Sequence, residues 1–228
     1  RCEDAACVPT LRARAAPRTI AGMPTRTLFD DEHHAFRESF AQFVSKELVP
    51  DYLQWEADGI VPREVFTRAG RFGFLGMAIP ERYGGGGVDD FRFNQVIGEE
   101  GAAAGVTGAI AGITLHNDVC TPYFTEYCTE EQAERWLPGI ASGELITAIA
   151  MTEPGTGSDL AGIAATAIRD GDEYVLNGSK TFITNGVNSD LIIVVAKTDP
   201  TQRHSGMSLL VVERGMAGFE RGRNLDKV

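Results

Sequence analysis

The stretch LITAIAMTEPGTGSD, residues 145–159, divides the chain into two kinds of pattern. Before Gly143, apolar residues recur every three to four positions, which is typical of amphipathic helices. From Leu145 onward they alternate or form short continuous runs bounded by turn residues, which is typical of strands. The quoted stretch therefore predicts a first strand over 145–152, followed by a loop rich in glycine and hydroxyl groups.

Residues 23–143 are predicted to form an all-α domain. A first helix follows the acidic residues 30–32, because carboxylates stabilise a helix N-terminus. Its apolar face comprises Phe36, Phe40, Phe43, Val44 and Leu48. A second helix starts at Pro62 and stops near Gly73, and its apolar face comprises Val65, Phe66, Ala69 and Phe72.

Three further features of this half have a predicted role. The Gly84–Gly87 run lacks the Lys-Ser or Lys-Thr of a phosphate loop and is predicted to be a flexible connection. His116 lies in an apolar run and is predicted to be a hydrogen-bonded core residue rather than a catalyst. Thr129 and Gln132 form a capping box for a last helix that we expect to end at Pro138 and Gly139.

Residues 144–228 are predicted to form a β domain. The expected strands lie in LITAIAMT, EYVLNG, KTFITNG, DLIIVVAKT and MSLLVVE. Asp170-Gly171 and Asn177-Gly178 are hairpin signals, because the tight turns that they favour need positive φ angles. The chain is thus predicted to be α+β, with a helical domain followed by a mainly antiparallel β-barrel or sandwich.

Composition excludes several classes of protein. A formal net charge of −11 without a basic stripe argues against nucleic-acid binding, and no apolar run approaches the roughly 20 residues of a membrane-spanning helix. The four cysteines show no metal-binding spacing, so no metal is expected. Residues 1–22 are predicted to be a disordered extension. We expect a cytoplasmic protein, or one of the mitochondrial matrix if those residues are an Arg-rich targeting peptide.

The loop after the first strand suits a polar or anionic ligand, because its glycines let backbone amides point outward. It does not match the dinucleotide fingerprint, since Leu160 stands where that motif needs glycine or alanine. Leu160 also excludes the hydrolase nucleophile elbow around Ser158. A polar loop that merely closes one end of a barrel is the alternative.

AIAMTEPGTGSDLAG followed by VLNGSKTFITNG resembles the signature pair of acyl-CoA dehydrogenases. The resemblance covers residues 27–228 and includes LFDDEHHAFRESFAQFV and NSDLIIVVAKTD; it is greatest for the long-chain members. The family has a helical domain, a β domain and a C-terminal helical bundle. The resemblance implies that residues 27–228 correspond to the first two, with the β domain incomplete, and that the bundle is absent before Val228.

The resemblance implies FAD chemistry. A carboxylate takes the α proton of a fatty acyl-CoA, the β hydride goes to the flavin, and electrons pass to an electron-transferring flavoprotein during β-oxidation. It implies a flavin lined by residues 149–158 and 182–184, with Thr152 and Thr184 as hydroxyl donors and Ser158 as a contact to the thioester ligand. The implied cofactor-binding residues are Ile149, Ala150, Met151, Thr152, Gly157, Ser158, Phe182, Ile183 and Thr184.

Two departures from the family accompany these implications. Phe182 stands where many relatives have tryptophan, so the ring can stack but lacks the indole donor. The family's catalytic glutamate comes from the C-terminal bundle, so the base is expected beyond Val228. Glu153, Glu99 and Glu100 are poor substitutes, and Glu153 is expected to make structural hydrogen bonds.

The resemblance also leaves the assembly and the reaction type open. A tetramer is expected only if the C-terminal bundle is present. The alternatives are a truncated, non-catalytic flavin-binding or interaction fragment, and an acyl-CoA oxidase-like flavoprotein.

Overall fold

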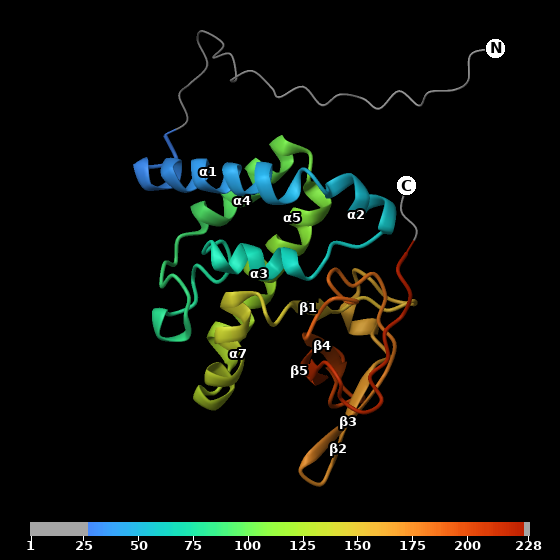
Figure 1. Ribbon diagram of the computed structural model, residues 1–228. Coiled ribbons are helices and arrows are strands. Elements are labelled where there is room, and N and C mark those ends of the chain that lie inside the picture. Colours follow the sequence, from blue (N-terminus) through green and yellow to red (C-terminus); the bar gives the residue numbers. More distant parts are fainter. Residues whose placement is uncertain (1–26, 226–228) are drawn as a thin grey trace, which may run out of the picture.

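The computed structural model describes residues 27–225, which form a helical part and a sheet part (Figure 1). The predicted extension over residues 1–22 lies outside the described residues. The order of the two parts confirms the α+β prediction. Within residues 27–225, no helix is both long enough and apolar enough to cross a membrane.

The helical part is built from α-helices, and the longest connection between them, residues 72–90, joins α3 to α4. Its α-helices are α1 Asp31–Phe43, α2 Tyr52–Asp58, α3 Glu64–Arg71, α4 Phe91–Ala104, α5 Thr107–Thr114, α6 Thr121–Tyr127 and α7 Glu130–Ser142. Two π-helical turns, η1 Val44–Leu48 and η3 Leu115–Cys120, continue α1 and α5. The capping box predicted at Thr129 and Gln132 begins α7 and is confirmed.

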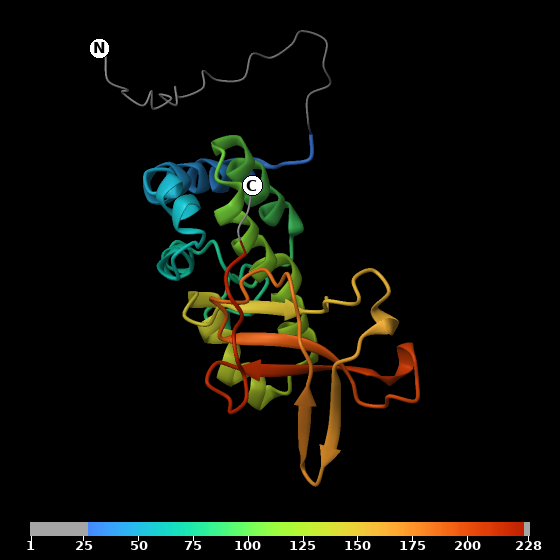
Figure 2. The ribbon, with the colours of Figure 1, turned by 90° about the vertical axis from the view of Figure 1, so that its right-hand side faces the viewer.

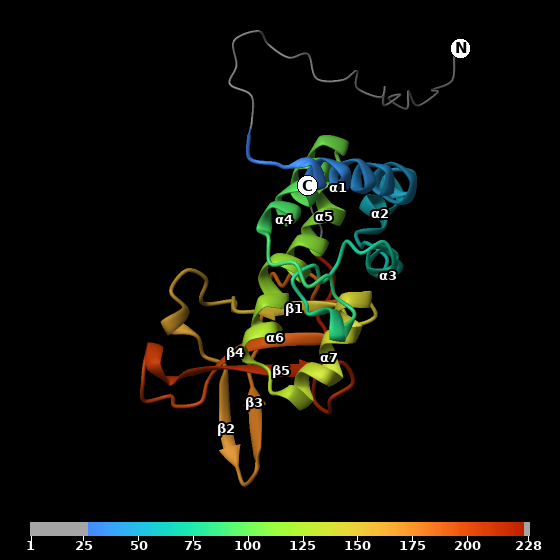
Figure 3. The ribbon, with the colours of Figure 1, turned by 90° about the vertical axis from the view of Figure 1, so that its left-hand side faces the viewer.

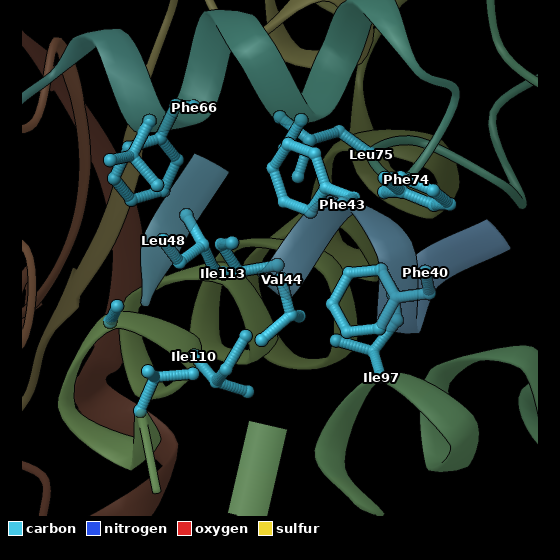
Figure 4. Packing of buried hydrophobic residues seen from close by; sticks show 14 of the residues in the cluster. Phe40, Phe43, Val44, Leu48, Phe66, Phe74, Leu75, Ile97, Ile110 and Ile113 are labelled. Carbon is cyan, nitrogen blue, oxygen red and sulfur yellow. The ribbon is translucent and has the colours of Figure 1, made fainter. Parts of the chain in front are cut away.

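Bulky apolar side chains fill the space between these helices (Figure 4). Phe40 is fully buried, and its ring meets that of Phe74 edge to face with centroids 4.8 Å apart. Phe66 and Ile113 are buried in the same cluster, which joins α1, α3 and α5. The apolar face predicted for the first helix is therefore confirmed at Phe40, Phe43, Val44 and Leu48, with Phe36 half buried beside them.

Two predictions about the helices of this part need correction. Phe72 is 58% exposed, because α3 ends at Arg71 and the chain turns through Gly73 at φ +75°. The last helix passes through Pro138 and ends only at Ser142, since burial of Ile140 stabilises the final turn despite the missing N–H. Gly143, at φ +76°, terminates it.

The Gly84–Gly87 run is not a free connection. The Gly86 amide donates to the Gly76 carbonyl at 3.2 Å, and the Gly87 amide donates to the Ile79 carbonyl at 2.9 Å. A Cβ on Gly85 would lie 2.1 Å from the Ile79 carbonyl oxygen. Glycine therefore serves close backbone packing here rather than flexibility.

The sheet part is a five-stranded mixed sheet with β4 at its centre. The strands are β1 Thr147–Ala150, β2 Thr166–Asp170, β3 Glu173–Asn177, β4 Leu191–Lys197 and β5 Met207–Glu213. β4 pairs parallel with β1 and, through Thr166 and Lys197 alone, with β2. The longer ladders, β4 with β5 and β2 with β3, are antiparallel as predicted.

One predicted strand and one predicted hairpin are wrong. KTFITNG forms turns rather than a strand, because Phe182 and Asn185 adopt positive φ angles of 57° and 62°. Asn177-Gly178 consequently ends β3 without a hairpin. The hairpin at Asp170-Gly171 is confirmed, with Gly171 at φ +62°, and it extends away from the rest of the molecule (Figure 2).

Helices α6 and α7 cover one face of the sheet (Figure 3). Phe124 and Trp136 from these helices pack in one cluster with Ile149, Leu191 and Ile193 from β1 and β4. The two parts therefore share a continuous apolar boundary, and the loop after β1 emerges beside it.

Candidate functional site

Two segments that are distant in sequence lie side by side after β1. The Thr181 amide donates to the Thr152 carbonyl at 2.9 Å, and the Lys180 Nζ donates to the Met151 carbonyl at 3.0 Å. These bonds bring the loop 151–158 against the segment 180–185. The structure thus brings together the two stretches that sequence analysis had selected.

A buried ion pair holds the loop 151–158 against the segment 180–185. Lys180 Nζ lies 2.8 Å from Glu153 Oε1, and the side chains are only 11% and 7% exposed. The other Glu153 contacts are the amides of Ala164 and Ala165, at 2.6 and 3.0 Å. Burial alone would raise the pKa of Glu153, but the bonds from Lys180 and the two amides outweigh it and lower that pKa. The predicted structural role of Glu153 is confirmed.

The predicted site residues differ in their exposure. Ile149 and Ala150 are buried in β1, so their backbone rather than their side chains is available to a ligand. Met151 and Thr152 are half buried, whereas Gly157 and Ser158 lie exposed at the far end of the loop. Along the loop, an isolated bridge between Glu153 and Thr156 shapes the intervening turn.

The second segment presents an aromatic ring on an unusual backbone. Phe182 is 73% exposed and has φ 57°, a conformation that non-glycine residues seldom adopt. Ile183 is half buried and Thr184 is exposed. Asn185, also left-handed, anchors the segment by donating its side-chain amide to the carbonyls of Gly112 at 2.9 Å and Thr147 at 3.2 Å.

A cavity of about 200 Å³ lies beside Thr184. It is lined by Ala111, Thr114, Leu115, Asp118, Val119 and Thr184. Burial raises the pKa of the Asp118 carboxyl, although the 2.6 Å hydrogen bond from Asn94 opposes this shift. Because π-helical turns are frequent at functional sites, η3 is a suitable wall for a ligand groove.

A second cavity, of about 330 Å³, borders the loop itself. Its lining includes Glu153, Gly155 and Thr156 from the loop and Gly178 and Ser179 from the chain after β3. The loop therefore borders the larger cavity, and the segment that contains Thr184 borders the smaller one.

His116 has a structural environment, as predicted. It is fully buried; Nε2 lies 3.0 Å from the Ile140 carbonyl, and Nδ1 lies 3.2 Å from the Thr147 amide. These partners assign the neutral tautomer with the proton on Nε2. Burial lowers the pKa of His116 to about 4, although the Ile140 contact partly opposes the shift.

Two other clusters of titratable groups among residues 27–225 already have their polar atoms engaged by neighbouring residues. Glu99 and Glu100 pair with Arg37 at 2.7 and 2.5 Å between α4 and α1. Asp30, Glu32 and His33 lie within 4.8 Å of one another. However, both ring nitrogens of His33 are engaged, by the Asp30 amide at 3.2 Å and the Asp90 carboxylate at 3.3 Å, so neither is free for a metal ion.

Lys180 and Asn185 are the residues that sequence analysis missed. The Asn185-Gly186 pair was available as a signal for a left-handed turn, but it was assigned to the end of a strand. Lys180 follows a glycine and a serine, and no neighbouring residue in the sequence indicates that it is buried. Only the fold shows that it lies against Glu153, 27 residues earlier.

Comparisons with known proteins identify the family of both parts of the chain. Residues 30–144 match the acyl-CoA dehydrogenase N-terminal domain and residues 148–228 match the middle domain. The chain is 44% identical to the mitochondrial long-chain specific acyl-CoA dehydrogenase of Mus musculus, over 100% of this chain and 53% of that protein.

Solved structures give the same result. An acyl-CoA dehydrogenase from Geobacillus kaustophilus aligns with a TM-score of 0.85 and 52% identity over 89% of this chain and 53% of its own. A glutaryl-CoA dehydrogenase from Mycobacterium smegmatis, in complex with FADH2, aligns with a TM-score of 0.76 and 30% identity over 84% of this chain and 48% of its own.

The chain thus spans about half the length of these relatives. Both of its parts match a domain of one and the same family, in that family's order. The chain belongs to the acyl-CoA dehydrogenase family.

Proposed function

We propose that this chain is the helical and sheet portion of an FAD-dependent enzyme that dehydrogenates a fatty acyl-CoA to the trans-2-enoyl-CoA. Its electron acceptor is an electron-transferring flavoprotein. The family supports the reaction class, and the long-chain relative supports a fatty acyl substrate. The mitochondrial designation of that relative supports the matrix as the location.

The residues of the two adjacent segments fit a flavin. A flavin ring system is flat and largely apolar, with hydrogen-bonding groups along one edge. Phe182 offers an exposed aromatic face, and Thr152 and Thr184 offer hydroxyl donors beside it on the paired segments. One observation carries the proposal: the exposed ring and the hydroxyl groups lie on two segments that the Thr181–Thr152 backbone bond joins.

Bound FAD supplies the hydride acceptor for the reaction. The chain's own residues would bind and orient it: Thr184 and Thr152 would donate hydrogen bonds to it, and Phe182 and Ile183 would restrict water. The backbone of Ile149–Met151 together with Gly157 and Ser158 would contact the cofactor, and Ser158 would also contact the thioester ligand. Fixed donors of this kind stabilise the negative charge that reduction places on the ring.

Glu153, Glu99 and Glu100 are not assigned as the base. Glu153 is held by Lys180 and two backbone amides, and Glu99 and Glu100 by Arg37. Removing a proton from carbon needs a carboxylate that can approach the substrate. The fragment's role in the proposal is therefore cofactor and substrate positioning.

The test is anaerobic titration of the purified full-length gene product with acyl-CoA thioesters of increasing chain length. Loss of the flavin absorption band with formation of enoyl-CoA supports the proposal. Purification without flavin contradicts it and favours a non-catalytic module. Reoxidation by oxygen as fast as by an electron-transferring flavoprotein would identify an oxidase instead.

A further inference from the structure

A buried carboxylate lies where the helical and sheet parts meet. Asp190, immediately before β4, is 8% exposed. Its side chain accepts from Arg63 Nη2 at 2.7 Å, Arg214 Nε at 2.8 Å and the Ile146 amide at 2.8 Å. Arg63 precedes α3, Arg214 follows β5 and Ile146 leads into β1. One carboxylate thus joins three separate stretches of chain.

The same arginines also hold the loop that precedes Asp190. Arg63 Nη1 and Arg214 Nη2 both donate to the Asn188 carbonyl, the latter at 2.8 Å. Arg221 Nη2 donates to the Ser189 carbonyl at 2.8 Å. Arg214 and Arg221 lie on the chain that runs back from β5 toward the helices (Figures 1 and 2). The guanidinium N–H groups that do not bind Asp190 therefore donate to the backbone carbonyls of Asn188 and Ser189.

This loop is continuous with the segment that contains Phe182 and Thr184. The Ser189 amide donates to the Asn185 carbonyl at 2.7 Å, and the Gly186 amide donates to the Ile183 carbonyl at 2.9 Å. The Asn188 side chain donates to the Val61 carbonyl at 2.7 Å, close to Arg63 in sequence. A displacement of the loop at Asn188 would therefore be transmitted to Ile183 through two short turns.

We propose that Asp190, Arg63 and Arg214 form a clasp between the two parts, and that this clasp positions residues 182–184 against the cofactor. These are positioning residues, because they contact the loop and would not contact the cofactor. The identity of the ligand rests on the proposed function, whereas the ordering of the loop does not. Removal of one partner leaves a buried charge short of a donor, which is far costlier than the loss of an exposed pair.

The test compares Arg63→Met with Arg135→Met in the full-length gene product. Arg135 pairs with Glu213 at 2.8 Å and also joins the two parts, between α7 and β5, but its side chain is 64% exposed and its hydrogen bond is to Glu213 rather than to the loop. The first measurement is amide hydrogen exchange at Gly186 and Ser189 in the cofactor-free protein. We expect Arg63→Met to accelerate this exchange about tenfold, and Arg135→Met to leave it within about twofold.

The second measurement is made on the FAD-loaded protein. Arg63→Met should weaken FAD binding by about tenfold and shift the flavin absorption band, with the band of Arg135→Met unchanged. Equal exchange and equal FAD affinity in the two variants would overturn the clasp. If the unaltered protein bound no FAD, the proposed function would fail, while the exchange result would still decide whether the clasp orders the loop.

Asp190→Asn provides a stronger version of the same test. It should accelerate exchange at Gly186 and Ser189 more than Arg63→Met does, because both guanidinium groups lose their charged partner. If Asp190→Asn does not fold, Arg63→Met carries the comparison, since Arg214 then still pairs with Asp190. Unchanged exchange in a folded Asp190→Asn protein would also overturn the proposal.

Discussion

The helical and sheet parts are held in shape by different means. The helical core contains large aromatic side chains, with Phe40, Phe66 and Phe74 at most 2% exposed. The sheet has satellite clusters in which alanine recurs, at positions 148, 150, 165, 167 and 196. Small side chains bury less apolar area and confer less packing energy than aromatic rings do.

Around the candidate site, buried polar contacts take the place of packing by large apolar side chains. The Glu153–Lys180 pair fixes the loop after β1, and the Asp190 cluster fixes the loop before β4. The difference indicates that packing sets the stability of the helical part, whereas a few buried polar contacts set the geometry of the site. Substitutions in the two regions should therefore differ in kind as well as in size.

The largest effect is expected from Phe40→Ala. The ring is fully buried against Phe43 and Phe74, so its loss should lower the free energy of unfolding by about 4 kcal/mol. Urea denaturation measures the change, and Phe72→Ala, at a position 58% exposed, is the matched control. Similar losses for the two variants would show that packing does not dominate this region.

The next effect is expected from Lys180→Met. The Glu153 carboxylate would remain buried with two amide donors but no cation, and unfolding should become easier by about 3 kcal/mol. Arg203→Met is the control, because it breaks a pair between Arg203 and Asp159 in which both side chains are mostly exposed. An unchanged denaturation midpoint for Lys180→Met would refute the role given to buried polar contacts.

A pH dependence should come from His116, at the boundary between the two regions. The pKa of His116 is about 6.5 in an unfolded chain, whereas burial lowers this pKa to about 4 in the folded protein. Stability present above about pH 6.5 is therefore lost as the pH falls toward 4, by up to about 1.4 kcal/mol per pH unit. His116→Gln should remove this component of a denaturation series recorded against pH; an unaltered slope would contradict the assignment.

The smallest effect is expected from Thr184→Val. This substitution keeps the shape of the exposed side chain and removes one hydroxyl donor, so FAD affinity should fall by about threefold to tenfold without loss of stability. Fluorescence titration of the cofactor-free protein measures it, with Thr201→Val as a control on a loop outside the site. Equal affinities for the two variants would remove Thr184 from the set of flavin donors.

Sequence periodicity predicted most of the fold but not the turn at residues 182–185 in the candidate site. The apolar faces around Phe40 and Val65 and the capping box at Thr129 were predictable, because each depends on residues close in sequence. The left-handed backbone at Phe182 and Asn185 was not, since KTFITNG has the local pattern of a strand. Tertiary contacts overrule that preference, and Asn185 is held by Gly112 and Thr147.

The same limit applies to the polar contacts. Glu153 was expected to make structural hydrogen bonds, but its partner Lys180 was not identified, and neither was the convergence of Arg63 and Arg214 on Asp190. Such pairs join residues up to 127 positions apart. A single sequence carries no local signal for contacts of that range.

We propose that the segments after β1 and around Thr184 together form the flavin site. The most direct test of this proposal is the hydrogen-exchange footprint of FAD on the cofactor-free, full-length gene product. We predict slower exchange in residues 149–158 and 180–186 on addition of FAD, with the helical core around Phe40 unchanged. Binding of FAD that leaves both segments unprotected would contradict this proposal.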